Sequence, residues 1–261
     1  MKSGLHIALR GKGRPVLGLA GFGCSNWIFD HWTDPLCRDH LLILPDNRGM
    51  GLSTPVQEPY EMDDLAADAL GVLKQYAKEP AIVLGVSMGG FIAQLLALKA
   101  PQTVQALVLM CTSSSGEPFV PLPYMSREAM KQFYELPPRE RALQAIGATT
   151  HPSFAQIQPQ RFQQVVQNRM HHASSWSQVS FQYDAVQRFM DRAVPLEHIS
   201  CPVLVMTGAD DRYVDPRNAS MLVERLPNAR LVVIERTDHL FFLEEPEKTV
   251  SAISEFLESL L

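Results

Sequence analysis

Residues 81–101 read AIVLGVSMGGFIAQLLALKAP. The first four residues are aliphatic and predict a buried strand, and the apolar run that follows residue 90 and ends at Pro101 predicts a buried helix. Gly85 and Gly89 stand two positions before and after Ser87, and their missing side chains allow a sharp turn. The segment therefore predicts a strand, a tight turn and a helix, with the Ser87 hydroxyl exposed at the turn.

A serine hydroxyl becomes a good nucleophile at neutral pH only when a base removes its proton, so the chain must also supply a base and an acid that orients it. The apolar run 202–206 predicts a strand that ends shortly before Asp211, and 231–234 predicts a strand that ends shortly before His239. The chain order Ser, Asp, His is the order expected after such a serine turn. Because the carboxyl ends of parallel strands meet at one sheet edge, we expect the three side chains to meet there.

These residues resemble the α/β-hydrolase superfamily, and the resemblance extends over nearly the whole chain. It implies an α/β fold in which helices flank a mostly parallel central sheet. The acid of that family commonly stands three residues after a glycine, which matches Gly208 and Asp211, so we prefer Asp211 to Asp210. We interpret Asp210, Asp215 and Asp238 as solvated loop acids or helix caps.

The resemblance also implies two backbone N–H groups that bind the oxyanion formed when Ser87 attacks a carbonyl. One is the N–H of Met88, and the other is the N–H of Phe22 in the loop that follows the predicted strand 16–19. Ala20 stands where the family has the histidine of a His-Gly-x-Gly motif. We therefore expect this loop to be softer than usual or to be held by other contacts.

We expect no role in ligand binding for two further patterns. The segment 46–53, DNRGMGLS, resembles a turn common in these hydrolases, in which Arg48 holds neighbouring loops. No lysine follows its glycines, which excludes a phosphate-binding loop. His171 and His172 point about 100° apart on a helix and have no carboxylate or cysteine at ligand spacing, so we expect no metal and no cofactor.

Strand and helix signals alternate through the chain except in residues 117–192, where only helical signals occur. We therefore predict a core of residues 1–116 and 193–261 and a helical cap of residues 117–192. The resemblance implies that such a cap lies over the nucleophile. The residues that we expect to line the substrate pocket are Trp27, Phe133, Met170, Trp176 and Leu240.

Composition favours a compact enzyme with a large core, since 46% of the 261 residues are hydrophobic. The net charge of −5 without a basic cluster argues against nucleic acid or an anionic membrane as a partner. The start of the chain does not resemble a signal peptide, and no apolar run approaches the roughly 20 residues of a membrane span, so we expect a cytoplasmic protein. The four cysteines stand far apart without a Cys-x-x-Cys motif, and we expect them to be reduced.

The sequence thus predicts a serine hydrolase that cleaves a carboxylic ester or lactone of a small apolar acyl substrate, similar to 3-oxoadipate enol-lactonases and pimeloyl-carrier-protein methyl ester esterases. Three alternatives stay open. A carbon–carbon bond hydrolase or a cofactor-free haloperoxidase would use the same triad, and a binding protein of hydrolase fold would not catalyse. A thioesterase or methyl esterase acting on an acyl carrier protein would need a basic cap rim, for which the candidates are Arg139, Arg141, Arg161 and Arg169.

Overall fold

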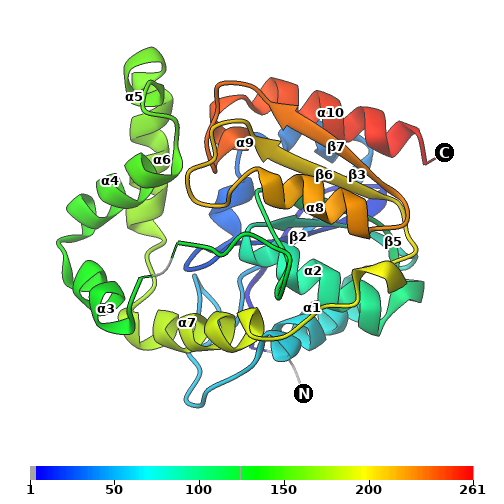
Figure 1. Ribbon diagram of the computed structural model, residues 1–261, viewed down its shortest axis with the longest axis horizontal. Helices are drawn as coiled ribbons and strands as arrows, with labels where there is room; N and C mark the ends of the chain where they lie inside the picture. Colours follow the sequence, from blue (N-terminus) through cyan, green and yellow to red (C-terminus); the bar gives the residue numbers. More distant parts are fainter. Residues whose placement is uncertain (1–3, 124, 261) are drawn as a thin grey trace.

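The computed structural model describes residues 4–123 and 125–260. Its strands form one seven-stranded sheet in the order β1-β3-β2-β4-β5-β6-β7 (Figure 1). Strand β1 is antiparallel to β3, and every other neighbouring pair is parallel. The strands are β1 (Ile7–Gly11), β2 (Arg14–Leu19), β3 (His40–Pro45), β4 (Ala81–Val86), β5 (Val104–Met110), β6 (Val203–Gly208) and β7 (Ala229–Ile234). The predicted, mostly parallel α/β fold is confirmed.

Helices cover both faces of the sheet, which explains why its central strands are aliphatic throughout. All six residues of β4 and all six of β6 are buried. Residues of α1, α2 and α8 share one apolar cluster with one face of the sheet, and residues of η1, α9 and α10 share another with the opposite face (Figure 1). These helices are η1 (Asn26–Phe29), α1 (Met62–Tyr76), α2 (Met88–Lys99), α8 (Arg217–Arg225), α9 (Phe241–Glu244) and α10 (Pro246–Glu258).

Short 3-10 helices lie in the remaining core connections. They are η2 (Asp34–Arg38), η3 (Pro101–Thr103) and η4 (Leu196–His198).

The turn after β3 is structural, as predicted, because the Arg48 guanidinium donates to the Asp68 carboxylate of α1 at 2.7 and 2.8 Å.

A helical segment is inserted between β5 and β6, and the described residues of this segment contain no strand. Helices α3 to α6 project beyond one side of the sheet, whereas α7 runs back beside α1 (Figure 1). The second half of α7 belongs to the main core, since the Phe189 ring stacks on Phe91 of α2 with centroids 4.9 Å apart. The helices are α3 (Arg127–Glu135), α4 (Pro138–Thr149), α5 (Phe154–Ile157), α6 (Pro159–His171) and α7 (Trp176–Met190).

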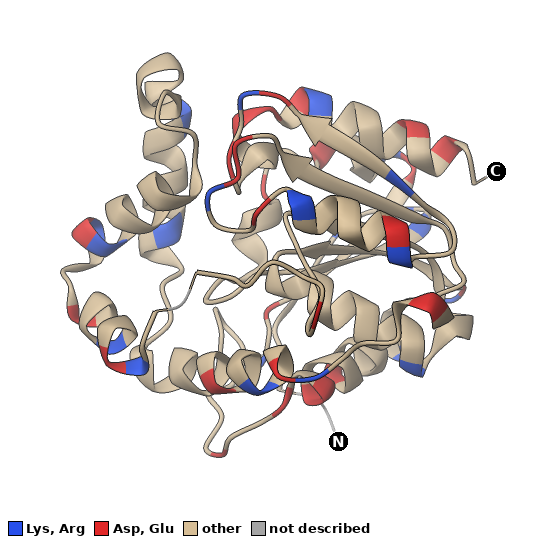
Figure 2. Cartoon of the chain, in the orientation of Figure 1, with Lys and Arg blue, Asp and Glu red and all other residues tan. Residues whose placement is uncertain are grey.

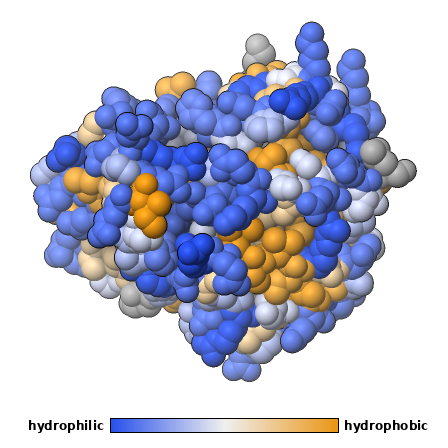
Figure 3. Space-filling view, turned by 90° about the horizontal axis from the view of Figure 1, so that it is seen from above, coloured by the Kyte–Doolittle hydropathy of each residue, from blue (hydrophilic) through white to orange (hydrophobic). Residues whose placement is uncertain are grey.

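Charges of both signs are interspersed over the exposed helices (Figure 2). Seen from above, apolar residues gather in a patch that polar residues surround (Figure 3). In residues 4–123 and 125–260, none of the helices has both the length and the apolar character needed to cross a membrane.

Candidate active site

Ser87 occupies a strained turn between β4 and α2. Its backbone has φ 54° and ψ −119°, a region that non-glycine residues rarely adopt. The flanking glycines are required by close packing: a Cβ at Gly85 would lie 2.5 Å from the Gly89 carbonyl oxygen, and a Cβ at Gly89 would lie 2.0 Å from the Leu19 carbonyl oxygen. The predicted strand, turn and helix are confirmed, and the turn holds the Ser87 side chain at the wall of a cavity.

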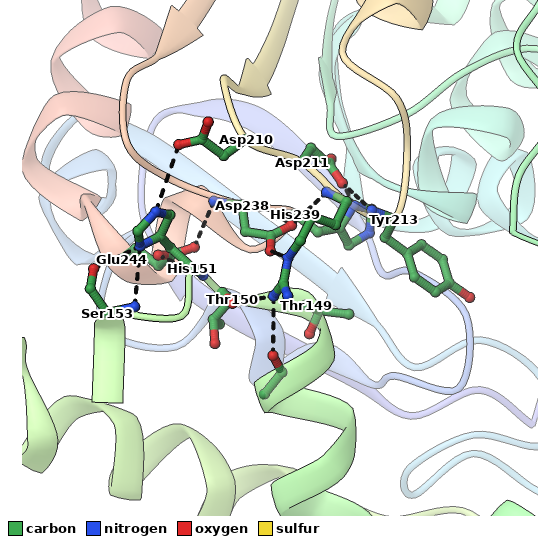
Figure 4. Close-up of polar contacts among 12 residues, drawn as sticks. Thr149, Thr150, His151, Ser153, Asp210, Asp211, Tyr213, Asp238, His239 and Glu244 are labelled. Carbon is green, nitrogen blue, oxygen red and sulfur yellow. Dashed lines mark hydrogen bonds and ion pairs between the residues drawn. The ribbon is translucent and has the colours of Figure 1, made fainter. Parts of the chain in front are cut away.

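The structure brings Asp211 and His239 together from the loops after β6 and β7. His239 Nδ1 lies 2.9 Å from Asp211 Oδ2, and both side chains are almost completely buried (Figure 4). Asp211 Oδ1 accepts the backbone N–H groups of Tyr213 and Val214, each at 2.8 Å. The Asp211 carboxylate is therefore fixed in orientation, and Nε2 is the nitrogen of His239 that is left for a reacting group. Asp210, in contrast, has a side chain that is 54% exposed.

Ser87 and His239 line the same cavity. Within the described part of the chain, Ser87 Oγ makes no hydrogen bond to the imidazole. Hydrogen bonds of this kind are often long in unliganded enzymes and tighten when substrate binds. The arrangement is chemically capable of passing a proton from the hydroxyl to the imidazole once a ligand closes the gap.

The prediction that Asp238 is a solvated acid or a cap is wrong. Its side chain is fully buried and forms an ion pair with Arg212, with Nε and Oδ2 2.6 Å apart. Asp238 Oδ1 also accepts the backbone N–H groups of Arg212 and His239, each at 2.8 Å. Asp238 thus joins the loop that carries Asp211 to the loop that carries His239.

Asp215 does act as predicted, since it accepts the N–H of Arg217 at the start of α8 at 2.9 Å.

Glu244 is a buried residue of this region that the sequence did not single out. Its Oε1 accepts the backbone N–H of Asp238 at 3.0 Å, and its Oε2 accepts that of His151 at 3.1 Å (Figure 4). Burial raises the pKa of Glu244 to about 7, against the lowering effect of these two N–H groups. Glu244 therefore connects the histidine loop to the segment after α4. The Leu240 N–H adds a hydrogen bond of 2.9 Å to the carbonyl oxygen of Thr149, the last residue of α4.

The loop of residues 21–24 lies beside Ser87. A Cβ at Gly21 would lie 3.3 Å from Ser87 Cβ, so the backbone approaches the serine closely. Phe22 lines the cavity next to Ser87. Met88 is the first residue of α2, so its N–H has no acceptor within the helix. The two residues expected to supply the oxyanion N–H groups thus lie next to Ser87, one in the chain and one in the cavity wall.

Two side chains of the inserted helices hold this loop where Ala20 replaces the motif histidine. Gln182 of α7, which is fully buried, accepts the Gly23 N–H through Oε1 at 2.6 Å. Arg169 of α6 donates to the Gly23 carbonyl oxygen at 2.8 Å. Of the two expectations for this loop, the structure therefore supports other contacts rather than softness. Sequence alone did not identify Gln182, because its role depends on the packing of α7 against a distant loop.

The cavity beside Ser87 has a volume of about 300 Å³. Trp27, Phe133 and Leu240 line it as predicted. Met170 and Trp176 do not: Met170 packs against the apolar cluster around α9, and the Trp176 ring packs on two tyrosine rings. The reason for Met170 is helical geometry, since its neighbour Arg169 lines the cavity and successive side chains point about 100° apart.

A second cavity of about 440 Å³ also reaches Ser87. Phe91, Phe119 and Met190 contribute to its mostly apolar wall. Both cavities share the following five residues: Phe22, Ser87, Met125, Met130 and Tyr213. Ser87 therefore lies at the junction of two apolar spaces, which the sequence did not reveal.

Three of the four arginines proposed for a basic cap rim have contacts within the chain: Arg161 donates to the Glu244 carbonyl oxygen and pairs with Glu247, Arg141 lies over the Tyr134 ring, and Arg169 lines the first cavity. Arg139 is exposed, and the basic rim stays a prediction. Elsewhere, among the residues that the structure describes, no three His, Cys, Asp or Glu side chains are grouped as metal ligands would be.

Residues 14–246 match the family model described as alpha/beta hydrolase fold, and the chain belongs to this family. It is 31% identical over 98% of its length to the polyketide synthase ThaQ of Burkholderia thailandensis, of which it spans 12%. It is 28% identical to the rhodomycin D methylesterase DauP of Streptomyces sp. strain C5, covering 92% of this chain and 89% of DauP. The structure of a thermophilic esterase from Thermogutta terrifontis superposes with a TM-score of 0.81 at 25% identity, covering 98% and 93% of the two chains. The chain is therefore an α/β hydrolase.

Proposed function

We propose that the protein is a serine hydrolase that cleaves a carboxylic ester or lactone through an acyl-enzyme. One observation carries the proposal: Ser87 stands in a strained turn on the wall of the cavity that His239 also lines, and Asp211 fixes His239 at 2.9 Å. Acyl transfer of this kind requires a nucleophile, an orienting acid and a base, which here follow β4, β6 and β7.

In this mechanism, Ser87 Oγ attacks the carbonyl carbon while His239 Nε2 accepts the hydroxyl proton. Asp211 stabilises the resulting imidazolium, and the N–H groups of Phe22 and Met88 bind the oxyanion. The tetrahedral intermediate then collapses, and His239 gives its proton to the departing alcohol oxygen or, in a lactone, to the ring oxygen. Water activated by His239 next attacks the acyl-enzyme, which releases the acid and restores Ser87.

The walls of the two cavities favour a small substrate with apolar parts on both sides of the carbonyl. The names of the similar methylesterase and esterase agree with ester hydrolysis, and equally similar proteins named as a putative non-heme bromoperoxidase and a 2-hydroxy-6-oxononadienedioate hydrolase represent the alternative reactions. An acyl part in one cavity and a leaving group in the other would place the scissile carbonyl at their junction, beside Ser87.

The proposal is tested by the hydrolysis of 4-nitrophenyl acetate and butyrate. Replacing Ser87 by Ala should lower turnover by about 10⁶-fold without changing the far-ultraviolet circular dichroism spectrum. Ser220→Ala, on the exposed side of α8, is the matched control and should retain activity. An active Ser87→Ala protein would contradict the proposal, and turnover of only β-diketones or halide-dependent substrates would favour the carbon–carbon hydrolase or haloperoxidase alternative.

A further inference from the structure

Arg169 places a positive charge in the mostly apolar wall of the cavity beside Ser87. None of the described residues that line this cavity is Asp or Glu, and no carboxylate of the described chain forms an ion pair with Arg169. The guanidinium uses one nitrogen, Nη1, which donates to the Gly23 carbonyl oxygen at 2.8 Å and to Cys24 Sγ at 2.7 Å. Neither of these two partners is a carboxylate. An arginine is always protonated, so its partial burial is costly without an anionic partner.

Two phenol hydroxyls accompany this charge. Tyr134 and Tyr213 both line the cavity. Burial raises the pKa of both phenols, and the nearby charge of Arg169 opposes that rise, so both are protonated donors at neutral pH. In the part of the chain that the structure describes, neither hydroxyl has a hydrogen-bond partner. One cation and two neutral donors therefore face the same small space.

This polar group lies close to Ser87 and His239. Arg169 touches Gly23 and Cys24, and the hydrogen bond from Cys24 N–H to the Gly21 carbonyl at 3.2 Å closes a turn whose first residue packs on Ser87. The ends of such a turn are less than about 7 Å apart. The Tyr213 ring, in turn, lies 5.1 Å from the His239 ring, measured between centroids. The guanidinium and the reacting groups therefore border one cavity of about 300 Å³.

We propose that Arg169, with the hydroxyls of Tyr134 and Tyr213, binds a carboxylate on the acyl part of the substrate. The substrate would then be a monoester of a short dicarboxylic acid or a lactone that carries a carboxylate. Guanidinium and carboxylate groups match in geometry, and such charge-assisted hydrogen bonds are among the strongest in proteins. The inference rests on the proposed ester or lactone hydrolysis and narrows its substrate class.

A purely structural role for Arg169 makes a different prediction. Holding the Gly23 carbonyl needs one N–H donor and no charge. A glutamine at position 169 would keep a donor while removing the charge. The loss of the loop contact would then affect charged and neutral substrates equally, whereas the loss of an anion site would affect only the charged one.

The test compares monomethyl glutarate with its neutral isostere, methyl glutaramate, in a pH-stat assay. The parent enzyme should hydrolyse the carboxylate ester with a kcat/KM about 10- to 100-fold above that of the amide, which is the range expected for a charge-assisted pair. Arg169→Gln should reduce this ratio to about one, and Tyr134→Phe should reduce it in part. Arg139→Gln, which makes the same charge change at an exposed position of the cap, should leave the ratio unchanged.

A parent enzyme that hydrolyses methyl glutaramate faster than monomethyl glutarate would overturn the inference. An Arg169→Gln variant that keeps the preference of the parent for monomethyl glutarate would overturn it too.

Calorimetry with Ser87→Ala supplies a readout that does not need turnover. Monomethyl glutarate should bind this variant, and binding should be lost in Ser87→Ala/Arg169→Gln. If neither ester nor any 4-nitrophenyl ester is hydrolysed but this difference in binding persists, the proposed reaction fails and the anion site stands. Equal binding by both variants would reject the site itself.

Discussion

Asp210 and Asp211 are adjacent carboxylates with opposite surroundings. Asp211 is buried and bonded to His239 and to two backbone N–H groups, whereas Asp210 is 54% exposed and lies 3.7 Å from His151 Nε2. Asp211→Asn should lower kcat by about 10⁴-fold, because an amide no longer orients and stabilises the charged imidazole. Asp210→Asn is the control and should change kcat less than about threefold, since exposed pairs contribute little. Equal losses in the two variants would show that Asp211 has no special role.

The spacing after Gly208 identified Asp211 because that glycine and the acid belong to one local turn. The prediction for Asp238 was wrong because its ion-pair partner is distant in the sequence. It is buried by Arg212, which comes from the loop after a different strand, and it binds the backbone of both loops. No pattern within a few residues of Asp238 distinguishes this arrangement from an exposed acid.

At the scale of elements, α7 holds the loop of residues 21–24 through one buried amide. Gln182→Leu should free the Gly23 N–H and lower kcat by about 10- to 100-fold with little change in KM, because a displaced loop weakens the binding of the oxyanion and not of the substrate. Gln178→Leu is a matched control on the same helix, since Gln178 bonds to the Val56 backbone and not to this loop. Comparable kcat values for the two variants would contradict the role of Gln182.

Glu244 links the histidine loop to the segment after α4 and makes stability depend on pH. Its pKa of about 7 in the folded chain exceeds its ordinary value of 4.5, so the folded state holds an extra proton between these values. Stability should therefore fall as pH rises from about 4.5 to about 7 and then level off, by on the order of 1–3 kcal/mol.

This dependence is measured as the difference in Tm between pH 5 and pH 8. Glu244→Gln should lower this difference by several degrees relative to the parent, because each kcal/mol corresponds to roughly 2–4 °C in a chain of about this size. Glu247→Gln changes an exposed carboxylate at the start of α10 and should keep the pH dependence of the parent. A parent-like pH dependence in Glu244→Gln would refute the assignment.

The sheet was predictable because its parallel strands are aliphatic runs in the sequence: β4 and β6 are buried throughout, and the edge strand β7 is partly buried. The sequence did not predict which side of each inserted helix faces the cavity. Met170 and Arg169 are neighbours, yet Arg169 lines the cavity and Met170 does not, and the sequence contains no local signal for that rotation.

For the whole molecule, the position of Ser87 between two apolar cavities predicts a dependence on acyl length. Each buried methylene should contribute about 0.8 kcal/mol, or roughly fourfold in kcat/KM, until the cavity is full. Efficiency on neutral 4-nitrophenyl esters should thus rise with chain length and then fall sharply. Phe133→Ala, in the cavity wall, should move the fall to longer chains.

Phe154→Ala provides the matched comparison within the inserted helices. Phe154 is buried against Phe162 and does not line the cavity, so this change should lower Tm and leave the chain-length profile unchanged. A flat profile from acetate to octanoate in the parent would show that neither cavity selects the acyl group.

Mass spectrometry of the intact protein, quenched during turnover of a slowly hydrolysed 4-nitrophenyl ester, tests the acyl-enzyme most directly. The account predicts a mass increase equal to one acyl group, located by peptide mapping on Ser87 and missing in Ser87→Ala. The Cys24 thiol, which lies in the wall of the same cavity, provides the internal comparison. Turnover without any adduct, or an adduct on Cys24 that persists in Ser87→Ala, would contradict the account.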